Sequence, residues 1–324
     1  MPDSNMSLPS VDVVVPVYGG WTHVEPCIDS LLSQSHPVTV FVVDDASPDD
    51  TADRIEAHFP GVTVLRNDEN SGFARSCNAG IRAGHGEVVI LVNSDVEAAP
   101  DMAETIARSF ARDERAGSSS PLLLQPDGRV DAYGVTADPT LAGFVRFHGA
   151  DAQRVDSNDP ISIGPYGALA GYRRTAIEDV GLLDENIFMY GEELELAFRL
   201  AASGWACASI PRALGSHIGA ASAGRGSRRQ RRLAGFGRGY TLRVYGVLRG
   251  RYALRAAFTE ALVCMLSAIR DRDLQSLIGR AEGWREGKGL PRRTVPLARL
   301  AQSISLRASL RMRLPGYWAQ RDAS

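Results

Sequence analysis

The sequence predicts an α/β fold, in which a mostly parallel β-sheet is flanked by helices and followed by a helical C-terminal appendage. Over residues 11–113, short apolar runs alternate with stretches of helical pattern. The apolar runs are continuous, which is typical of parallel strands that are covered by helices on both faces. With 324 residues, 44% of them hydrophobic, the chain can form one large core and an appendage.

The alternating pattern predicts the elements in order. Strands are expected over residues 11–17, 38–45, 61–67 and 87–95, and helices over residues 23–35, 51–59, 73–84 and 101–113. Residues 117–170 are irregular and contain many Gly and Pro residues, so they predict short strands and loops beside the sheet. A further helix is expected over residues 191–204, with Gly204 as its C-terminal stop.

The C-terminal third has a different character. Residues 223–232 are basic and Gly-rich, and we expect a mobile loop there. Apolar residues then recur at steps of three and four, which predicts an amphipathic helix; they are Leu254, Phe258, Leu262, Met265 and Ile269. Residues 297–314 are a second basic stretch compatible with a helix. We therefore expect a disordered tail (1–9), a catalytic α/β domain (10–222) and a basic helical region (223–324).

The net charge of −2 conceals a strong asymmetry. Residues 1–224 hold 14 Arg against 32 acidic residues, a net charge of −18, whereas residues 225–324 hold 22 basic against 6 acidic residues, a net charge of +16. A basic region of this kind could bind nucleic acid, a membrane surface or a diphosphate, or it could dock on the acidic body of the protein.

Cysteine usage and the absence of targeting signals favour the cytoplasm. The four cysteines are far apart and form no C-x-x-C pair, so they indicate neither a zinc site nor a disulfide framework. The first ten residues lack the features of a secretory signal, and no apolar run is long enough to span a membrane.

The predicted strand over residues 87–95 ends in Asn93, Ser94 and Asp95. These residue types favour turns, because their side chains bond to their own backbone. The carboxyl ends of strands in an open α/β sheet are also where ligands bind. A turn and a ligand site are therefore both compatible with these three residues.

Two neighbouring segments favour the ligand site. Asp44 and Asp45 end the second strand, and capping of the helix near Thr51 by Asp49 or Asp50 does not account for them. Arg75 lies in the first turn of the helix over residues 73–84, where the helix dipole disfavours a cation, so an anionic partner is expected. The loop after the first strand lacks G-x-G-x-x-G, which argues against a dinucleotide site. Polar ends of neighbouring strands at one sheet edge predict a nucleotide pocket.

Six ordered motifs resemble the inverting glycosyltransferases of family 2, which have the Rossmann-like GT-A fold. They are VVVPVYGG, VVDDASPDD, GFARSCNAGI, LVNSDVE, the long segment GALAGYRRTAIEDVGLLDENIFMYGEELELAFRLAASGW, and SHIGAAS. The resemblance covers roughly residues 10–222. Within the family, the sequence is most similar to rhamnosyltransferase-like bacterial enzymes that build cell-wall or surface polysaccharide.

The resemblance implies a donor site and a divalent metal. Asn93 takes the place of the first Asp of the family's D-x-D motif, Asp95 is implied to bind Mg²⁺ or Mn²⁺, and His217 to complete the metal or diphosphate site. Such metals prefer oxygen ligands and would neutralise the charge that develops on a leaving diphosphate. Asp45 is implied to hydrogen-bond the pyrimidine ring. The remaining implied donor residues are Pro16, Val17, Tyr18, Arg75, Asn78 and Ser94.

The resemblance also implies a general base at an acidic pair. Glu192 and Glu193 occupy the place of a Glu-Asp pair, and the second member, Glu193, is implied to be the base. An alternative is that acidic residues here simply favour the helix dipole, with Glu195 and Arg199 as a stabilising i,i+4 pair. Glu193 lies on a different face of the helix from that pair, so the alternative accounts for it less well.

The function expected from the resemblance is transfer of a sugar to an acceptor hydroxyl with inversion. The expected donor is dTDP-rhamnose, with a UDP-sugar as second choice, and the expected acceptor is a glycan or a polyprenyl-linked glycan. No nucleic acid is expected; an anionic membrane surface at the cytoplasmic side and a homodimer are candidate partners.

Two alternatives remain open. A sugar nucleotidyltransferase should carry a Gly-rich, Lys-containing signature after the first strand, but the chain has no Lys before Lys288. A catalytically inactive nucleotide-sugar-binding scaffold would be consistent with the departures at Asn93 and Glu193.

Overall fold

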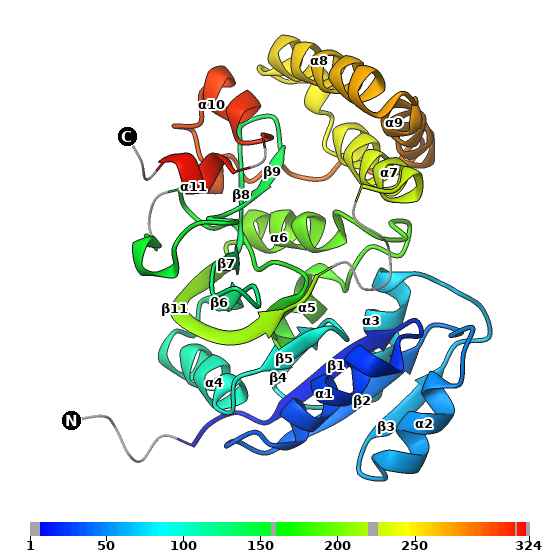
Figure 1. Ribbon diagram of the computed structural model, residues 1–324. Coiled ribbons are helices and arrows are strands. Elements are labelled where there is room, and N and C mark those ends of the chain that lie inside the picture. Colours follow the sequence, from blue (N-terminus) through cyan, green and yellow to red (C-terminus); the bar gives the residue numbers. More distant parts are fainter. Residues whose placement is uncertain (1–6, 157–159, 220–225, 315, 322–324) are drawn as a thin grey trace.

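The computed structural model describes residues 7–156, 160–219, 226–314 and 316–321, and it confirms the α/β class (Figure 1). Residues 1–6 of the predicted tail lie outside the described residues. The main sheet has the strand order β3-β2-β1-β4-β10-β6-β11-β5, and β7 pairs with β6. The four strands expected in the first half are all present and pair in parallel: β1 (Val11–Val17), β2 (Val38–Asp44), β3 (Thr63–Arg66) and β4 (Val88–Val92).

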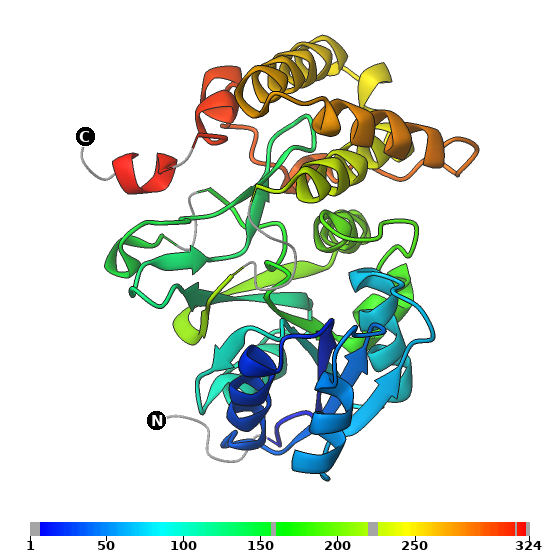
Figure 2. The same cartoon turned by 45° about the vertical axis from the view of Figure 1, so that its right-hand side comes forward.

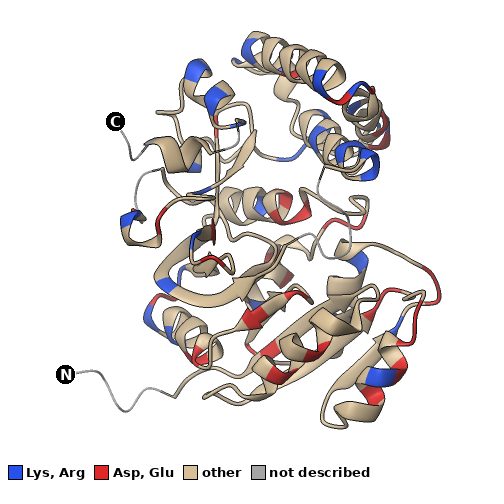
Figure 3. Ribbon diagram, in the orientation of Figure 1, with Lys and Arg blue, Asp and Glu red and all other residues tan. Residues whose placement is uncertain are grey.

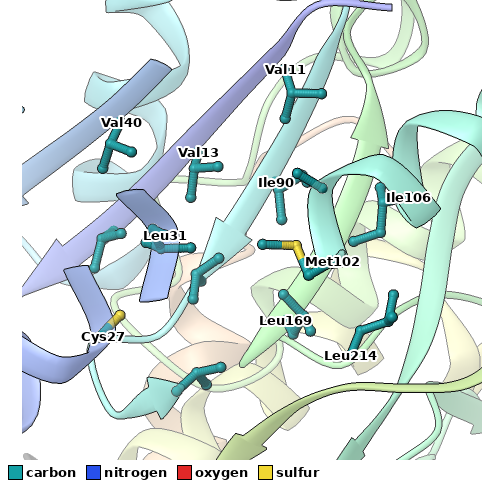
Figure 4. Packing of buried hydrophobic residues seen from close by; sticks show 14 of the residues in the cluster. Val11, Val13, Cys27, Leu31, Val40, Ile90, Met102, Ile106, Leu169 and Leu214 are labelled. Atoms are coloured by element: carbon teal, nitrogen blue, oxygen red, sulfur yellow. The ribbon is translucent and has the colours of Figure 1, made fainter. Parts of the chain in front are cut away.

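Helices cover both faces of this sheet, as the continuous apolar strands predict. On one face, Val13 and Ile90 pack with Leu31, Met102 and other apolar residues of the helices (Figure 4). This face is covered by α1 (Trp21–Leu32), α2 (Thr51–His58) and α4 (Met102–Arg112). The opposite face carries α3 (Phe73–Ala83), α5 (Arg174–Val180) and α6 (Glu192–Ala202). The last of these ends before Gly204, as expected.

The irregular stretch 117–170 forms short strands, as expected: β7 (Val130–Ala132), β8 (Val135–Ala137) and β9 (Gly143–Val145), with a 3₁₀ turn at Ala152–Arg154. Two other short strands lie before this stretch and at its end, β5 (Val96–Ala98) and β10 (Leu169–Arg173). Two longer strands, β6 (Ala116–Leu124) and β11 (Ala206–His217), pair in parallel. The sequence did not predict β11, because Pro211 lacks a backbone donor. The strand accommodates Pro211 where its register shifts between Ile210 and Ala213.

The C-terminal region is helical, but its helices differ from the expected ones. Residues 228–232 of the predicted mobile loop belong to α7 (Arg228–Val244); residues 223–225 lie outside the described part. The helix predicted from the apolar stripe is present as α8 (Ala253–Asp271), and α9 (Gln275–Glu286) follows it. The stretch 297–314 forms only a 3₁₀ turn (Leu297–Arg299) and α10 (Leu306–Arg311). Two further short helices are η2 (Val247–Arg249) and α11 (Tyr317–Arg321).

Helix α7 packs against two partners through closely spaced glycines. A Cβ atom at Gly239 would overlap the carbonyl oxygen of Arg280 in α9, and one at Gly235 would lie 2.6 Å from the carbonyl oxygen of Ser276. A Cβ at Gly237 would overlap the carbonyl oxygen of Tyr190, in the turn that precedes α6. Alternate glycines therefore bring α7 into backbone contact with α9 on one side and with the start of α6 on another.

The basic C-terminal region contacts the acidic body at buried ion pairs. Arg255 lies 3.0 Å from Asp138, and Arg293 lies 2.6 Å from Asp184. Many other basic residues of this region are exposed. Figure 3 shows their positions along the C-terminal helices. Docking of the basic region on the acidic body of the protein therefore accounts for only part of the positive charge of residues 225–324. None of the helices in the described part of the chain is both long and apolar enough to cross a membrane.

Candidate active site

A pocket of about 390 Å³ lies at the carboxyl ends of β1, β2 and β4, beside the first turn of α6. It brings together ten of the residues that the sequence singles out: Pro16, Val17, Tyr18, Asp45, Asn93, Ser94, Asp95, Glu192, Glu193 and His217. Several residues that the sequence did not single out complete the lining, among them Asp131, Tyr166, Tyr190 and Gln230. Because Gln230 belongs to α7, the C-terminal region forms part of the pocket wall.

Arg75 and Asn78 do not line this pocket. The side chain of Asn78 is buried and donates to the carbonyl oxygen of Leu183 at 2.9 Å, and it accepts from the Leu183 amide at 3.1 Å. Arg75 is largely exposed, with its Nε atom 3.9 Å from a carboxylate oxygen of Glu185. The structure therefore places these two residues outside the pocket lining, and their implied donor contacts stay a prediction. Asn78 holds the loop before α6, and Glu185 is the anionic partner expected for Arg75.

Asp45 lines the pocket and also holds the loop that precedes α3. Its Oδ1 atom accepts from the side chain of Asn67 and from the amide of Ser71, both at 2.8 Å, and its Oδ2 atom accepts from the amide of Gly72 at 2.9 Å. An ionised carboxylate offers about four acceptor positions. The three hydrogen bonds occupy three of these positions.

The end of β4 forms a tight turn, and its three polar residues also line the pocket. The amide of Val96 donates to the carbonyl oxygen of Asn93 at 3.1 Å. The turn places Asp95, which is buried, next to the end of β11, where its backbone carbonyl accepts from Ile218 at 3.1 Å. β5 and β11 pair with Val96 opposite His217, which fixes the neighbouring Asp95 and His217 at one corner of the pocket.

His217 lies between two carboxylates. Its Nδ1 atom is 2.7 Å from Oδ2 of Asp131, and its Nε2 atom is 3.1 Å from Oδ1 of Asp95 without hydrogen-bond geometry. Burial alone would lower the pKa of His217, but the two carboxylates outweigh it and raise the pKa to about 9. Within the described ranges, no three His, Cys, Asp or Glu side chains surround a common metal position. The residues at this corner of the pocket that could bind a divalent metal are Asp95 and His217.

Asp131 is one of the pocket residues that the sequence analysis missed. It is a single acidic residue in β7, within the segment that showed no regular pattern. Its partner His217 is 86 positions away in the chain. Only the pairing of β6 with both β7 and β11 brings the two side chains together.

The acidic pair begins α6 and follows two residues with left-handed backbone conformation. Tyr190 has φ 72° and Gly191 has φ 112°. A positive φ is unfavourable for Tyr, and strain of this kind persists only where the surrounding packing holds it, often at functional sites. Here the turn directs Glu192 and Glu193 into the pocket. The amide of Gly191 donates to Oε2 of Glu193 at 3.3 Å.

Burial raises the pKa of both glutamates. Glu192 is the more buried, its Oε2 atom has no hydrogen-bond partner, and the charge of Glu193 raises its pKa further. A carboxylate whose pKa lies above the ordinary value can accept a proton more effectively near neutral pH. The pair therefore releases its protons at a higher pH than ordinary glutamates do.

Glu195 has a different environment from this pair. It is fully buried and points away from the pocket, with its Oε2 atom 2.8 Å from Nε of Arg199. The hydroxyl of Tyr245 in the C-terminal region donates to its Oε1 atom at 2.8 Å, and Arg293 pairs with the same oxygen. The predicted i,i+4 pair is therefore present, within a larger buried network.

Residues 12–181, more than half of the chain, match the sequence model of Glycosyl transferase family 2. The chain belongs to this family. The family 2 glycosyltransferase is also 31% identical, over 239 residues, to an N-acetylglucosaminyl-diphospho-decaprenol L-rhamnosyltransferase of Mycobacterium tuberculosis. That alignment covers 66% of this chain and 77% of the relative.

Two solved structures share the fold of this family 2 glycosyltransferase. A mannosyltransferase from Pyrobaculum calidifontis, in complex with GDP-Man and Mn²⁺, has a TM-score of 0.54 at 18% identity, covering 98% of this chain and 85% of its own. GalNAc-T7 with UDP, GalNAc and Mn²⁺ has a TM-score of 0.55 at 18% identity, covering 80% of this chain and 55% of its own. The fold is therefore GT-A, as the resemblance implied.

Proposed function

We propose that this family 2 glycosyltransferase moves a sugar from a nucleoside diphosphate sugar to an acceptor hydroxyl with inversion at the anomeric carbon. The observation that supports this proposal is the arrangement of one pocket. Asp95 and His217 lie at one corner, and Glu192 and Glu193 lie at the first turn of α6. A donor bound between them would have its diphosphate near Asp95 and its reactive carbon within reach of the acidic pair.

The proposed reaction assigns one role to each part of the pocket. Glu193 accepts the proton of the acceptor hydroxyl while the hydroxyl oxygen forms a bond to the anomeric carbon. The bond from that carbon to the diphosphate oxygen breaks on the opposite face, and the nucleoside diphosphate leaves with the electron pair. Attack and departure on opposite faces produce the inversion.

A divalent cation fits the residues at the Asp95 corner. The Nε2 atom of His217 is buried and lies 3.1 Å from Oδ1 of Asp95, so these two residues would hold the cation together once the ring has released its proton. Mg²⁺ typically uses one or two carboxylates together with substrate phosphates. When bound, the cation would offset the negative charge that develops on the leaving diphosphate. The Mn²⁺ in the two structural neighbours is consistent with this proposal.

The donor we propose first is dTDP-rhamnose, with a UDP-sugar second. Support comes from the mycobacterial relative, which is named as an L-rhamnosyltransferase. The remaining acceptor position on Asp45 suits the ring N–H of a thymine or uracil base. Pro16, Val17 and Tyr18 would line the base and ribose, and Asn93 and Ser94 the sugar and phosphate side.

The acceptor we propose is a glycan on a polyprenyl diphosphate, in cell-wall or surface polysaccharide synthesis. The name of the mycobacterial relative includes such a lipid-linked acceptor. An acceptor of this type would place the reaction at the cytoplasmic face of a membrane. The family assignment argues against the nucleotidyltransferase alternative, and the intact acidic pair argues against an inactive scaffold.

The test is a transfer assay with dTDP-rhamnose and UDP-sugars, with Mn²⁺, Mg²⁺ or EDTA present. We expect product only with a pyrimidine donor and a divalent cation, and NMR of the product should show the anomeric configuration opposite to that of the donor. Glu193→Gln serves as the matched variant that binds donor without transfer. Retention of configuration, or full activity in EDTA, would contradict the mechanism.

A further inference from the structure

Helix α8 exposes its apolar face to solvent. The exposed fraction is 90% for Leu254, 55% for Phe258 and 69% for Ile269. The residues that form this face share a single side of the helix, and all are apolar: Leu254, Ala257, Phe258, Ala261, Met265, Leu266 and Ile269, which we call the α8 face. The stripe that predicts the helix is therefore directed outward, the reverse of a helix that packs on a protein core.

The polar side of α8 is the buried one. Glu260 is buried between two arginines, with Nε of Arg238 at 2.8 Å and Nε of Arg280 at 2.7 Å from its two oxygens. Arg255 pairs with the buried Asp138, and the hydroxyl of Thr259 is buried. Rotation of α8 to bury its apolar face would break all of these interactions. The outward orientation is thus fixed by the fold.

The α8 face lies at the outer end of the molecule and continues onto α9. Figures 1 and 2 both show α8 and α9 at the end opposite β2 and β3. Exposed apolar residues at the start of α9 extend the surface: Leu274, Leu277 and Ile278. Exposed apolar surfaces of this extent mark sites that bind a partner or a membrane.

A cluster of arginines adjoins the beginning of α8. Arg243, Arg249 and Arg292 line a small pocket of about 90 Å³ together with Trp284, and its lining contains no acidic residue. The Arg243 guanidinium lies over the Trp284 ring, 5.0 Å from the centroid. Arg249 belongs to η2, which contacts α8. This arginine pocket is suited to a phosphate group, because guanidinium groups form strong charge-assisted hydrogen bonds with phosphate oxygens.

We propose that the α8 face and the arginine pocket dock the protein on an anionic lipid membrane. The apolar side chains would enter the boundary between headgroups and acyl chains, and the arginines would bind lipid phosphates. This inference rests on the proposed function in one respect, since a lipid-linked acceptor gives the enzyme a reason to bind a membrane.

A second copy of the chain fits this surface less well. Exposed arginines lie at both ends of α8, Arg251 before it and Arg272 at its end, and Arg270 pairs with Asp271 of its own chain. In a two-fold symmetric dimer the same patch meets itself, so the α8 face would bring a second set of the same arginines toward it. Anionic headgroups would instead supply negative charge beside the arginine pocket.

Vesicle flotation at low salt tests the proposal. We expect wild-type protein to float with vesicles that contain phosphatidylglycerol and not with pure phosphatidylcholine vesicles. The double variant Phe258→Glu/Ile269→Glu should lose binding. Arg249→Gln/Arg292→Gln should bind about 30-fold more weakly, because each basic residue near such a surface contributes about 1 kcal/mol. Leu32→Glu, on α1 and 47% exposed, is the matched control and should bind as wild type.

Two results would overturn the proposal: wild-type protein that does not float with anionic vesicles at low salt, or a Phe258→Glu/Ile269→Glu variant that floats as well as wild type. Light scattering tests the competing possibility that the α8 face binds a second copy of the chain. A wild-type dimer that becomes monomeric in this variant, together with no flotation, would assign the surface to a second copy. Nucleotide binding by the same variants, measured by calorimetry, reports separately on the proposed function and should be unchanged.

Discussion

The Nδ1 atom of His217 lies 2.7 Å from Oδ2 of Asp131, while the opposite ring nitrogen faces Asp95. A carboxylate on the far side of a metal-binding histidine fixes the orientation and the tautomer of the ring. Asp131 would therefore act on a metal through His217. This relationship gives the first prediction.

Asp131→Asn should weaken Mn²⁺-dependent nucleotide binding by about 10–100-fold, the usual effect of removing such a partner. Calorimetry with the nucleoside diphosphate, with and without Mn²⁺, measures it. Binding in EDTA should change little, because Asp131 acts only through the metal ligand. Asp127→Asn is the control, since Asp127 is exposed in the neighbouring loop. Equal losses with and without metal would show a purely structural role.

Asp95→Asn should abolish the dependence of nucleotide affinity on Mn²⁺ while the fold survives. The backbone contacts of Asp95 to Ile218 do not involve its side chain, so the strand pairing remains. Circular dichroism checks the fold, and calorimetry checks the metal. A variant with unchanged Mn²⁺-dependent affinity would remove Asp95 from the site.

Glu193→Gln should slow transfer by about 10²–10⁴-fold, the usual contribution of a general base, while donor binding stays close to wild type. Glutamine preserves size and hydrogen bonding but cannot accept the proton. Single-turnover transfer measures the rate, with Glu192→Gln as the matched variant. If Glu192→Gln is inactive and Glu193→Gln retains the wild-type rate, the base is Glu192.

The raised pKa values of Glu192 and Glu193 give a prediction for pH. The folded protein holds these protons at pH values where the unfolded chain has released them, so the free energy of unfolding falls as pH rises above the ordinary Glu value of 4.5. Glu192→Gln cannot ionise, so it removes the part of this pH-dependent loss of stability that comes from Glu192. The melting temperature of the variant should therefore exceed that of wild type at pH 8 but not at pH 4. A lower melting temperature at pH 8 would show that Glu192 is ionised and well solvated. In the wild-type enzyme, the acid limb of transfer activity should lie above pH 4.5.

Glu195→Gln should destabilise the fold by about 3 kcal/mol, because it removes the carboxylate partner of the largely buried Arg199 and leaves Arg293 with Asp184 alone. Urea unfolding measures the free energy. Nucleotide affinity in the folded variant should match wild type, since Glu195 does not line the pocket. A loss of affinity larger than the loss of stability would contradict the structural role.

The sequence predicts most of the first half of the fold because the strands there are buried on both faces. Residues 88–92 contain no polar residue, and the buried Asp12 is the only polar residue in 11–17. The strand β11 escapes prediction because it contains Pro211 and Gly215 and adjoins β6 through irregular pairing. The stripe on α8 predicts a helix correctly, but periodicity cannot reveal that its apolar side faces outward.

The pocket residues that follow the ends of strands could be predicted from the sequence. The pocket residues in other segments could not. Asp45 and Asp95 follow buried strands, so their place at one sheet edge can be inferred from the alternation of elements. Asn78 carries an amide that suits a ligand and a loop carbonyl equally well, and here it binds the loop. Asp131 and Gln230 reach the pocket only through long-range pairing and packing, which leave no local pattern in the sequence.

The contacts of helix α7 bear on which residues a catalytically active fragment must contain. Gly237 lets α7 press against Tyr190, whose strained backbone precedes the acidic pair, and Gln230 lines the pocket. A fragment cut near residue 222 would therefore lose one wall of the pocket and the support of the turn that presents Glu192 and Glu193. We therefore expect the smallest catalytic unit to extend past the matched segment 12–181 and to include at least α7 and, through its glycine contacts, α9.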